Sequence, residues 1–168
     1  MDDAPDRGES RPPELQDLLH LCRSLNREGA RYLLIGGFAV ILHGFVRTTK
    51  DVDLLVDPSD ENIAVVKRAM ASLPDNAASL LANDEVRKYN VVRVADEIVV
   101  DLMGSACGIT YDEALASGIE TPTVEGVEIP LASKPLLIRM KDTIRPHDAM
   151  DVSFLRLKIE EDMKAGKA

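Results

Sequence analysis

The sequence predicts a mixed α/β fold, of the α+β or α/β class, in which a mixed β-sheet packs against helices and further helices end the chain. Apolar residues recur at helical spacing toward both ends of the chain, and the shorter apolar runs between them are typical of strands. The length of 168 residues suits one hydrophobic core. We therefore expect a single domain over residues 12–168, preceded at residues 1–11 by a disordered leader rich in charge, Gly and Pro.

In the first half of the domain, helices and strands are expected to alternate. Gly29 can end the first helix, Ser59 can cap a later one, and Pro74 can stop it. The Gly36-Gly37 pair marks a tight turn between a strand and a helix. The expected elements are a helix over residues 13–29, a strand over 32–35, a helix over 38–42, a strand over 51–57 and a helix over 60–73.

The second half is expected to hold a hairpin and the C-terminal helices. Ala95-Asp96 separates two strand-like runs by the spacing of a β-hairpin, so these strands should be antiparallel. Ser133 can cap a helix that has Pro135 in its first turn, and Pro146 breaks the helical pattern. The expected elements are a weak helix over residues 77–87, strands over 90–94 and 97–103, a short helix over 111–117, β-rich residues over 119–130, and helices over 133–143 and 148–164.

Composition and charge exclude several classes of protein. No apolar run approaches the roughly 20 residues that span a bilayer, and the N-terminus lacks a signal-peptide pattern, so we expect a cytoplasmic protein without a membrane partner. Twenty Lys and Arg against 29 Asp and Glu give a net charge of −9, which disfavours extended nucleic-acid binding. Cys22 and Cys107 lack a CxxC spacing, which predicts buried thiols rather than a disulfide or a zinc site.

Two aspartates on one predicted strand form the candidate metal site. Side chains alternate along a strand, so Asp51 and Asp53 should project from the same face, roughly 7 Å apart. Mg²⁺ binds one or two protein carboxylates and completes its shell with water and substrate oxygens. Gly36 and Gly37 have no Cβ, so their backbone amides can approach a phosphate closely. Together these features predict a site for a metal-bound nucleotide; a solvated acidic strand face is the alternative.

This constellation resembles the nucleotidyltransferase superfamily related to DNA polymerase β. The motif of that superfamily is an apolar residue and a Gly-Gly or Gly-Ser pair, followed after a short segment by Asp-x-Asp or Asp-x-Glu between apolar positions. Gly36, Gly37, Asp51 and Asp53 match it. The surrounding sequence is similar to the branch of AbiEii-type toxin transferases and small antibiotic nucleotidyltransferases, through Ala39, His43, Arg47, Thr49 and the segment DVDLLV.

The resemblance implies a nucleotidyltransferase fold that binds Mg²⁺ or Mn²⁺ and a nucleoside triphosphate. It implies that Asp51, Asp53 and Asp101 are catalytic residues and metal ligands, with Asp101 binding the second metal or accepting the proton of the attacking hydroxyl. His43 is expected to orient the Gly-rich turn. Helical spacing leaves open whether Asp148 or Asp151 faces the site. The nucleotide-binding residues that the resemblance implies are Gly36, Gly37, Arg47, Thr49, Lys141 and Asp148.

The implied activity is transfer of a nucleoside monophosphate from the triphosphate to an acceptor hydroxyl, with release of pyrophosphate. The acceptor would be a small molecule, tRNA or a protein, and the sequence does not choose among them. The resemblance also suggests a homodimer or a toxin–antitoxin partner. The alternative is a catalytically silent nucleotide-binding protein, or an antitoxin-like regulatory protein, that keeps the same fold; nucleotide binding without pyrophosphate release would favour it.

Overall fold

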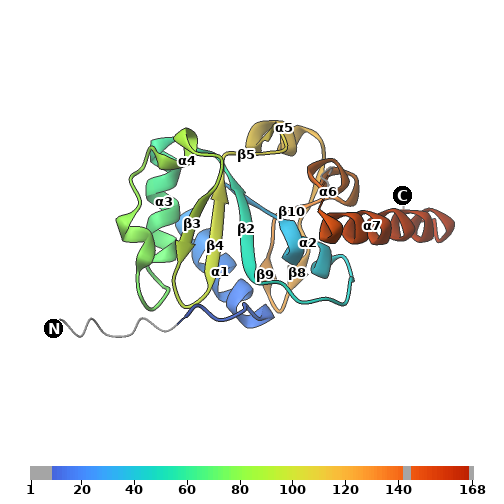
Figure 1. Ribbon diagram of the computed structural model, residues 1–168, viewed down its shortest axis with the longest axis horizontal. Helices are drawn as coiled ribbons and strands as arrows, with labels where there is room; N and C mark the ends of the chain where they lie inside the picture. Colours follow the sequence, from blue (N-terminus) through green and yellow to red (C-terminus); the bar gives the residue numbers. More distant parts are fainter. Residues whose placement is uncertain (1–8, 142–144, 167–168) are drawn as a thin grey trace.

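The computed structural model describes residues 9–141 and 145–166. Within them, a mixed six-stranded sheet has the order β3-β4-β2-β1-β10-β7 (Figure 1). Its strands are β1 (Tyr32–Ile35), β2 (Asp51–Val56), β3 (Val92–Ala95), β4 (Val99–Met103), β7 (Ile119–Glu120) and β10 (Leu131–Ala132). Two small hairpins are formed by β5 (Ser105–Ala106) with β6 (Ile109–Thr110) and by β8 (Thr123–Val124) with β9 (Val127–Glu128).

The helices begin and end largely where the sequence predicts. Gly29 ends the first helix with φ 75°, and the side chain of Ser59 accepts a hydrogen bond from the backbone N–H of Asn62 to cap the third. The helices are α1 (Leu15–Glu28), α2 (Gly36–Leu42), α3 (Asp60–Met70), the 3₁₀ turn η1 (Ala77–Leu80), α4 (Glu85–Lys88), α5 (Tyr111–Ala116), α6 (Lys134–Met140) and α7 (Pro146–Lys164).

The direction of the central strands decides which side chains meet. Strand β2 lies between β1, to which it is antiparallel, and β4, to which it is parallel. The edge strand β3 pairs antiparallel with β4, as predicted for the hairpin. On the other side, β1 pairs parallel with β10, and β7 closes that edge antiparallel. Side chains of β2 and β4 at the same register therefore lie next to each other on the same face.

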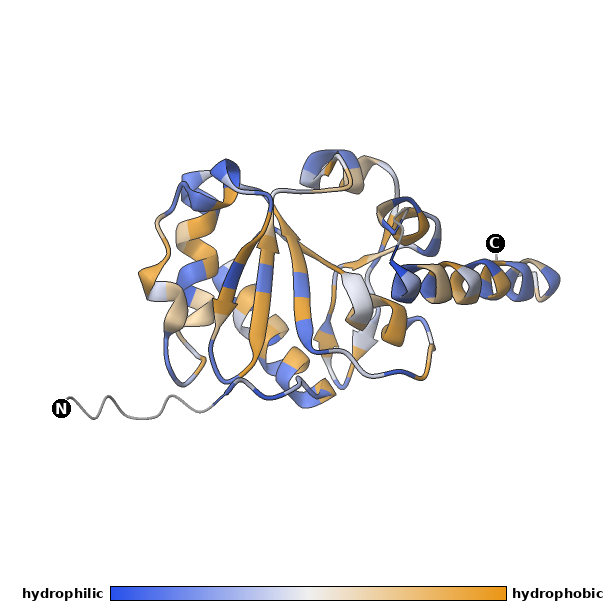
Figure 2. Cartoon of the chain, viewed as in Figure 1, coloured by the Kyte–Doolittle hydropathy of each residue, from blue (hydrophilic) through white to orange (hydrophobic). Residues whose placement is uncertain are grey.

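The two faces of the sheet have different surroundings. Helix α1 lies behind the sheet in Figure 1, where it buries a row of leucines, and α3 lies at the left beside β3. Val52 and Leu54 of β2 are fully buried, whereas Asp51 and Asp53, which alternate with them, are partly exposed. Figure 2 shows hydrophilic positions interrupting the hydrophobic strands β2, β3 and β4. One face thus belongs to the core and the other is polar.

Several predictions of local structure need correction. The weak helix over residues 77–87 is instead the 3₁₀ turn η1 and the single turn α4, because residues 81–84 do not continue the helix. The short strands β5, β6 and β10 were not predicted. The predicted end of the helix over 133–143 lies outside the described residues. So does most of the predicted leader, whose last residues Ser10 and Arg11 hydrogen-bond Asp96 and Glu97.

Two expectations from composition can also be compared with the structure. Among the helices of residues 9–141 and 145–166, none has both the length and the apolar character needed to cross a membrane. Cys22 is buried as predicted, but the prediction of a buried thiol is wrong for Cys107. Cys107 lies exposed in the β5-β6 turn with φ 47°, where its Sγ contacts the carbonyl oxygen of Met140 at 2.8 Å.

Candidate functional site

Three carboxylates meet on the polar face of the sheet. Asp53 on β2 is the register partner of Asp101 on the parallel strand β4, and Asp51 lies two residues before Asp53 on the same face. One oxygen from each carboxylate lies within 4.8 Å of the others. Asp101 is 5% exposed, and the other two are partly exposed. We call Asp51, Asp53 and Asp101 the carboxylate cluster; the structure brings together all three acids that the sequence suggests.

The carboxylate cluster is electrostatically unfavourable without a cation. Burial raises the pKa of Asp53 to about 7, and the neighbouring charges of Asp51 and Asp101 add to this rise. Burial, followed by the charge of Asp101, also raises the pKa of Asp51. Three clustered carboxylates supply the hard oxygen ligands that Mg²⁺ and Mn²⁺ prefer. The donor set therefore fits a divalent cation.

Arg93, which the sequence patterns did not single out, pairs with this cluster. It lies on β3 in register with Asp101. Its Nε donates to Oδ1 of Asp101 at 2.9 Å, and its Nη2 donates to Oδ2 of Asp101 at 3.0 Å and to Oδ2 of Asp51 at 3.3 Å. These contacts raise the pKa of the Arg93 guanidinium, mainly through the hydrogen bond to Asp101. In the described structure the cluster thus holds a cation supplied by the protein.

The glycine pair lies directly against the carboxylate cluster. Strand β1 passes into α2 at Gly36, whose φ is 73°. A Cβ at Gly36 would lie 2.0 Å from Oδ2 of Asp53, so no side chain fits while Asp53 keeps this position. A Cβ at Gly37 would lie 2.9 Å from Oγ1 of Thr49 and 3.2 Å from Nη2 of Arg47. Both glycines therefore leave room where the backbone borders the site.

A second group of charged residues joins α6, α7 and the segment after α2. Asp151, which is 1% exposed, accepts hydrogen bonds from Nη1 of Arg47 at 2.7 and 2.6 Å and forms an ion pair with Nζ of Lys141 at 2.9 Å. The same Lys141 nitrogen lies 3.5 Å from Oδ1 of Asp148, whose other oxygen accepts from Nε of Arg145 at 2.9 Å. We call Arg47, Lys141, Asp148 and Asp151 the ion-pair cluster.

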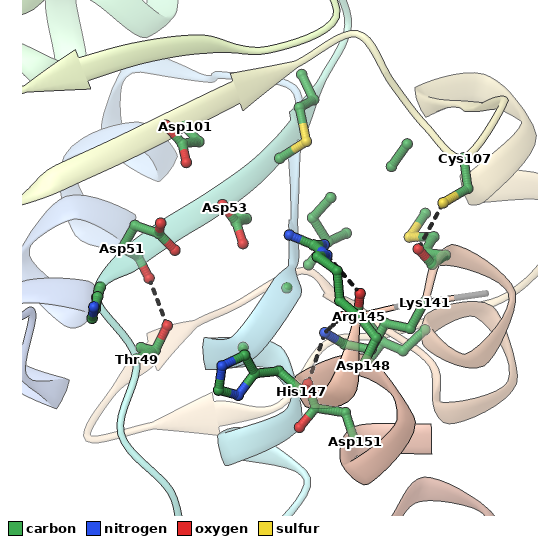
Figure 3. A pocket seen from close by; sticks show the side chains of 18 of the residues that line it. Thr49, Asp51, Asp53, Asp101, Cys107, Lys141, Arg145, His147, Asp148 and Asp151 are labelled. Atoms are coloured by element: carbon green, nitrogen blue, oxygen red, sulfur yellow. Dashed lines mark hydrogen bonds and ion pairs between the residues drawn. The ribbon is translucent and has the colours of Figure 1, made fainter. Parts of the chain in front are cut away.

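One cavity of about 1100 Å³ connects the two clusters. Figure 3 shows the carboxylate cluster on strands at one side and Lys141, Arg145, Asp148 and Asp151 at the other side. All the residues that the resemblance implies for nucleotide binding line this cavity, namely Gly36, Gly37, Arg47, Thr49, Lys141 and Asp148. The sequence left open whether Asp148 or Asp151 faces the site; in the structure both side chains line this cavity.

Two residues near the glycine turn have local structural contacts. Thr49 donates from Oγ1 to the carbonyl oxygen of Asp51 at 3.2 Å, which ties the loop after α2 to the start of β2. His43 was expected to orient the Gly-rich turn, but its ring forms a hydrogen bond to a different element. Its Nε2 lies 2.9 Å from the carbonyl oxygen of Ala132 on β10, and burial lowers its pKa. His43 therefore links the end of α2 to the neighbouring strand.

The fold is similar to those of solved nucleotidyltransferase-like structures. One is an antigenic nucleotidyltransferase-like protein from Paracoccidioides brasiliensis, at 18% identity and a TM-score of 0.55, with 91% of this chain and 78% of that chain covered. Another is a protein from Thermotoga maritima assigned provisionally as a nucleotidyltransferase, at 17% identity and a TM-score of 0.50, with 88% and 92% covered. No protein-family model and no curated protein matches the chain. The chain has a nucleotidyltransferase-like fold, as the sequence predicts.

Proposed function

We propose that this protein is a metal-dependent nucleotidyltransferase, which moves a nucleoside monophosphate from a nucleoside triphosphate to an acceptor hydroxyl. The observation that carries this proposal is the convergence of Asp51, Asp53 and Asp101 within 4.8 Å, beside the glycines Gly36 and Gly37. Such an arrangement offers carboxylate oxygens to a divalent ion and an uncrowded backbone to phosphates. The nucleotidyltransferase-like fold of the chain supports this choice over a solvated acidic face.

In this proposal Asp51, Asp53 and Asp101 hold Mg²⁺ or Mn²⁺, which when bound neutralises the charge of the triphosphate. The oxygen of the acceptor hydroxyl forms a bond to the α-phosphorus, and the bond from that phosphorus to the oxygen bridging the β-phosphate breaks. Pyrophosphate leaves, and an oxygen of the carboxylate cluster accepts the hydroxyl proton. Arg93 donates to both oxygens of Asp101, and the two roles that the resemblance suggests for Asp101, ligand of the second metal or acceptor of the hydroxyl proton, both stay open in this proposal.

The ion-pair cluster is proposed to hold the triphosphate from the other side of the cavity. Arg47 and Lys141 are the cations of this cluster, and both line the cavity. Their pairing with the buried Asp151 fixes the two side chains in place and leaves their remaining N–H groups as donors. Preorganised cations of this kind stabilise phosphate charge at little cost in side-chain entropy.

The acceptor, the AbiEii-type branch and a toxin–antitoxin role remain predictions from the sequence resemblance. The direct test is to incubate the protein with each labelled ribonucleoside triphosphate, Mg²⁺ or Mn²⁺, and fractions of a cell extract containing small molecules, RNA or protein. We expect pyrophosphate release and label in one fraction with the wild type, and neither with Asp51→Asn/Asp53→Asn. Asp112→Asn, at a side chain that is 85% exposed, is the matched control and should behave as the wild type.

A negative result has a specific meaning in this experiment. Nucleotide binding that requires metal, without pyrophosphate release in any fraction, would contradict the proposed transfer. It would support the alternative of a silent nucleotide-binding or antitoxin-like regulatory protein. Equal activity of the wild type and the double variant would instead remove the carboxylate cluster from the reaction.

A further inference from the structure

Arg93 bridges two strands of the carboxylate cluster. Its Nη2 donates to Oδ2 of Asp101 at 3.0 Å and to Oδ2 of Asp51 at 3.3 Å, so a single nitrogen lies between carboxylates of β4 and β2. Its Nε holds the other oxygen of Asp101 at 2.9 Å. A fork of this kind gives Asp101 a fixed orientation.

Nη2 contacts two of the carboxylates that would hold a divalent metal ion. A cation that binds both Asp51 and Asp101 uses oxygens of the same two carboxylates that Nη2 now contacts. A guanidinium and a divalent ion that share these carboxylates would repel each other. The side chain of Arg93 is 61% exposed, so its guanidinium can move from Asp51 into solvent.

We propose that Arg93 is an internal cation that bridges Asp51 and Asp101 in the metal-free protein and that a divalent metal ion displaces it from Asp51. This inference rests on the proposed metal site. Arg93 then has two effects: it stabilises three neighbouring acids while no metal is bound, and it lowers the affinity of the cluster for metal. In the competing arrangement, Arg93 keeps its contacts with both Asp51 and Asp101 when metal binds.

Metal affinity tests whether Arg93 opposes metal binding, and the resonance of its guanidinium separates displacement from an Arg93 that keeps its contacts. We would titrate Mn²⁺ into the wild type, Arg93→Met and Arg93→Lys by calorimetry, after circular dichroism has established that each is folded. Displacement predicts that Arg93→Met, which keeps the length of the stem without the charge, binds Mn²⁺ at least about threefold more tightly. Arg93→Lys keeps the charge and should stay closer to the wild type. Arg87→Met, whose arginine pairs with Asp60 away from the cluster, is the control and should not change Mn²⁺ affinity.

A measurement on the unaltered protein avoids any effect of the substitution on folding. The Nη2–H resonance of Arg93, which reports on the contact with Asp51, is assigned by its loss in Arg93→Lys, and Mg²⁺ is then added to the ¹⁵N-labelled wild type. Displacement predicts that this resonance moves toward the position of a solvent-exposed arginine and that the change saturates with the metal. Metal binding with an unmoved resonance, or with equal or weaker affinity in Arg93→Met, overturns displacement and leaves the metal site standing. Absence of metal binding in the wild type and in every variant contradicts the proposed metal site itself, and the displacement with it.

Discussion

A Cβ at Gly36 would lie 2.0 Å from Oδ2 of Asp53. Gly36 directly follows β1, whose last residue, Ile35, is the register partner of Asp53 on the neighbouring strand β2. The glycine pair and the Asp-x-Asp segment are therefore parts of one contact surface, although they are separated in the sequence. The absence of a side chain at Gly36 makes room for the carboxylate of Asp53.

Substituting Gly36 by alanine should damage both the fold and the site. The residue has φ 73°, which costs an alanine about 1 kcal/mol, and the clash with Asp53 adds to that cost. We expect Gly36→Ala to lower the free energy of unfolding by about 3 kcal/mol in urea titrations. Gly29→Ala is the matched control, because Gly29 has φ 75° and a Cβ added there would meet nothing within 4 Å. Equal losses of unfolding free energy in both variants would mean that the close approach of Gly36 to Asp53 does not contribute to stability.

The raised pKa of Asp53 predicts a pH dependence of stability in the metal-free protein. The pKa is about 7 in the folded protein, against about 4 in an unfolded chain. Between these values the folded state keeps a proton that the unfolded state has released, so stability falls as the pH rises from about 4 to about 7. Asp53→Asn has no carboxyl proton to lose. Over that pH window its free energy of unfolding should therefore fall less than that of the wild type, by a difference of at least about 1 kcal/mol.

The measurement is the free energy of unfolding in chelator at several pH values from about 5 to about 8.5, which brackets the roughly neutral titration expected for Asp53. Above about pH 7 the asparagine variant should be more stable than the wild type, because it removes a charge from a crowded cluster. Parallel pH profiles for the two proteins would show that Asp53 is not protonated in this range. Asp112→Asn at the surface serves as control and should reproduce the wild-type profile.

In the ion-pair cluster, Asp151 should matter more for stability than Asp148. Asp151 is 1% exposed and neutralises both Arg47 and Lys141 at short distances. Asp151→Asn leaves those cations without their shared carboxylate, and we expect a loss of about 3 kcal/mol. Asp148→Asn should cost less, because Lys141 lies 3.5 Å away and keeps Asp151 as its nearer partner. The reverse ranking in urea denaturation would contradict this interpretation of the cluster.

Lys141 should contribute to nucleotide affinity. Loss of one charged donor to phosphate is expected to weaken binding of a non-hydrolysable triphosphate analogue in Mg²⁺ about tenfold. Fluorescence or calorimetric titration of Lys141→Met measures this. Lys158→Met is the control, because Lys158 lies farther along α7, pairs with Glu161 and is not among the residues that line the cavity. An unchanged affinity in a folded Lys141→Met variant would leave Lys141 a structural partner of Asp151 alone.

Local patterns were sufficient to predict which residues lie together at the centre of the candidate site. The Gly36-Gly37 pair and Asp51-x-Asp53 each depend on the conformation of a few consecutive residues. Strand β1, which ends just before the glycines, and strand β2, which carries the aspartates, both lie where predicted. The shared orientation of Asp51 and Asp53 follows from alternation along a strand. Asp148 and Asp151, three residues apart on α7, face the same cavity because residues at that spacing share one face of a helix.

Arg93 could not be found in the same way, because its role depends on register between strands. The predicted hairpin, with a two-residue connection after Val94, would pair Arg93 with Ile98. In the structure the connection is longer, Ala95 pairs with Val99, and Arg93 therefore lies opposite Asp101. The strand β10 was missed because its two residues, Leu131 and Ala132, are too few to give a periodic pattern, and its position beside β1 is fixed by tertiary contacts.

The most direct test of the proposed function follows the α- and γ-phosphates of the same triphosphate in parallel reactions with Mg²⁺ and the acceptor fraction. Nucleotidyl transfer predicts that α-³²P label appears in the acceptor and that γ-³²P label appears only in pyrophosphate, with both absent in Asp51→Asn/Asp53→Asn. Label from the γ-phosphate in the acceptor, or transfer that survives in the double variant, would contradict the assignment of this carboxylate cluster to nucleotidyl transfer.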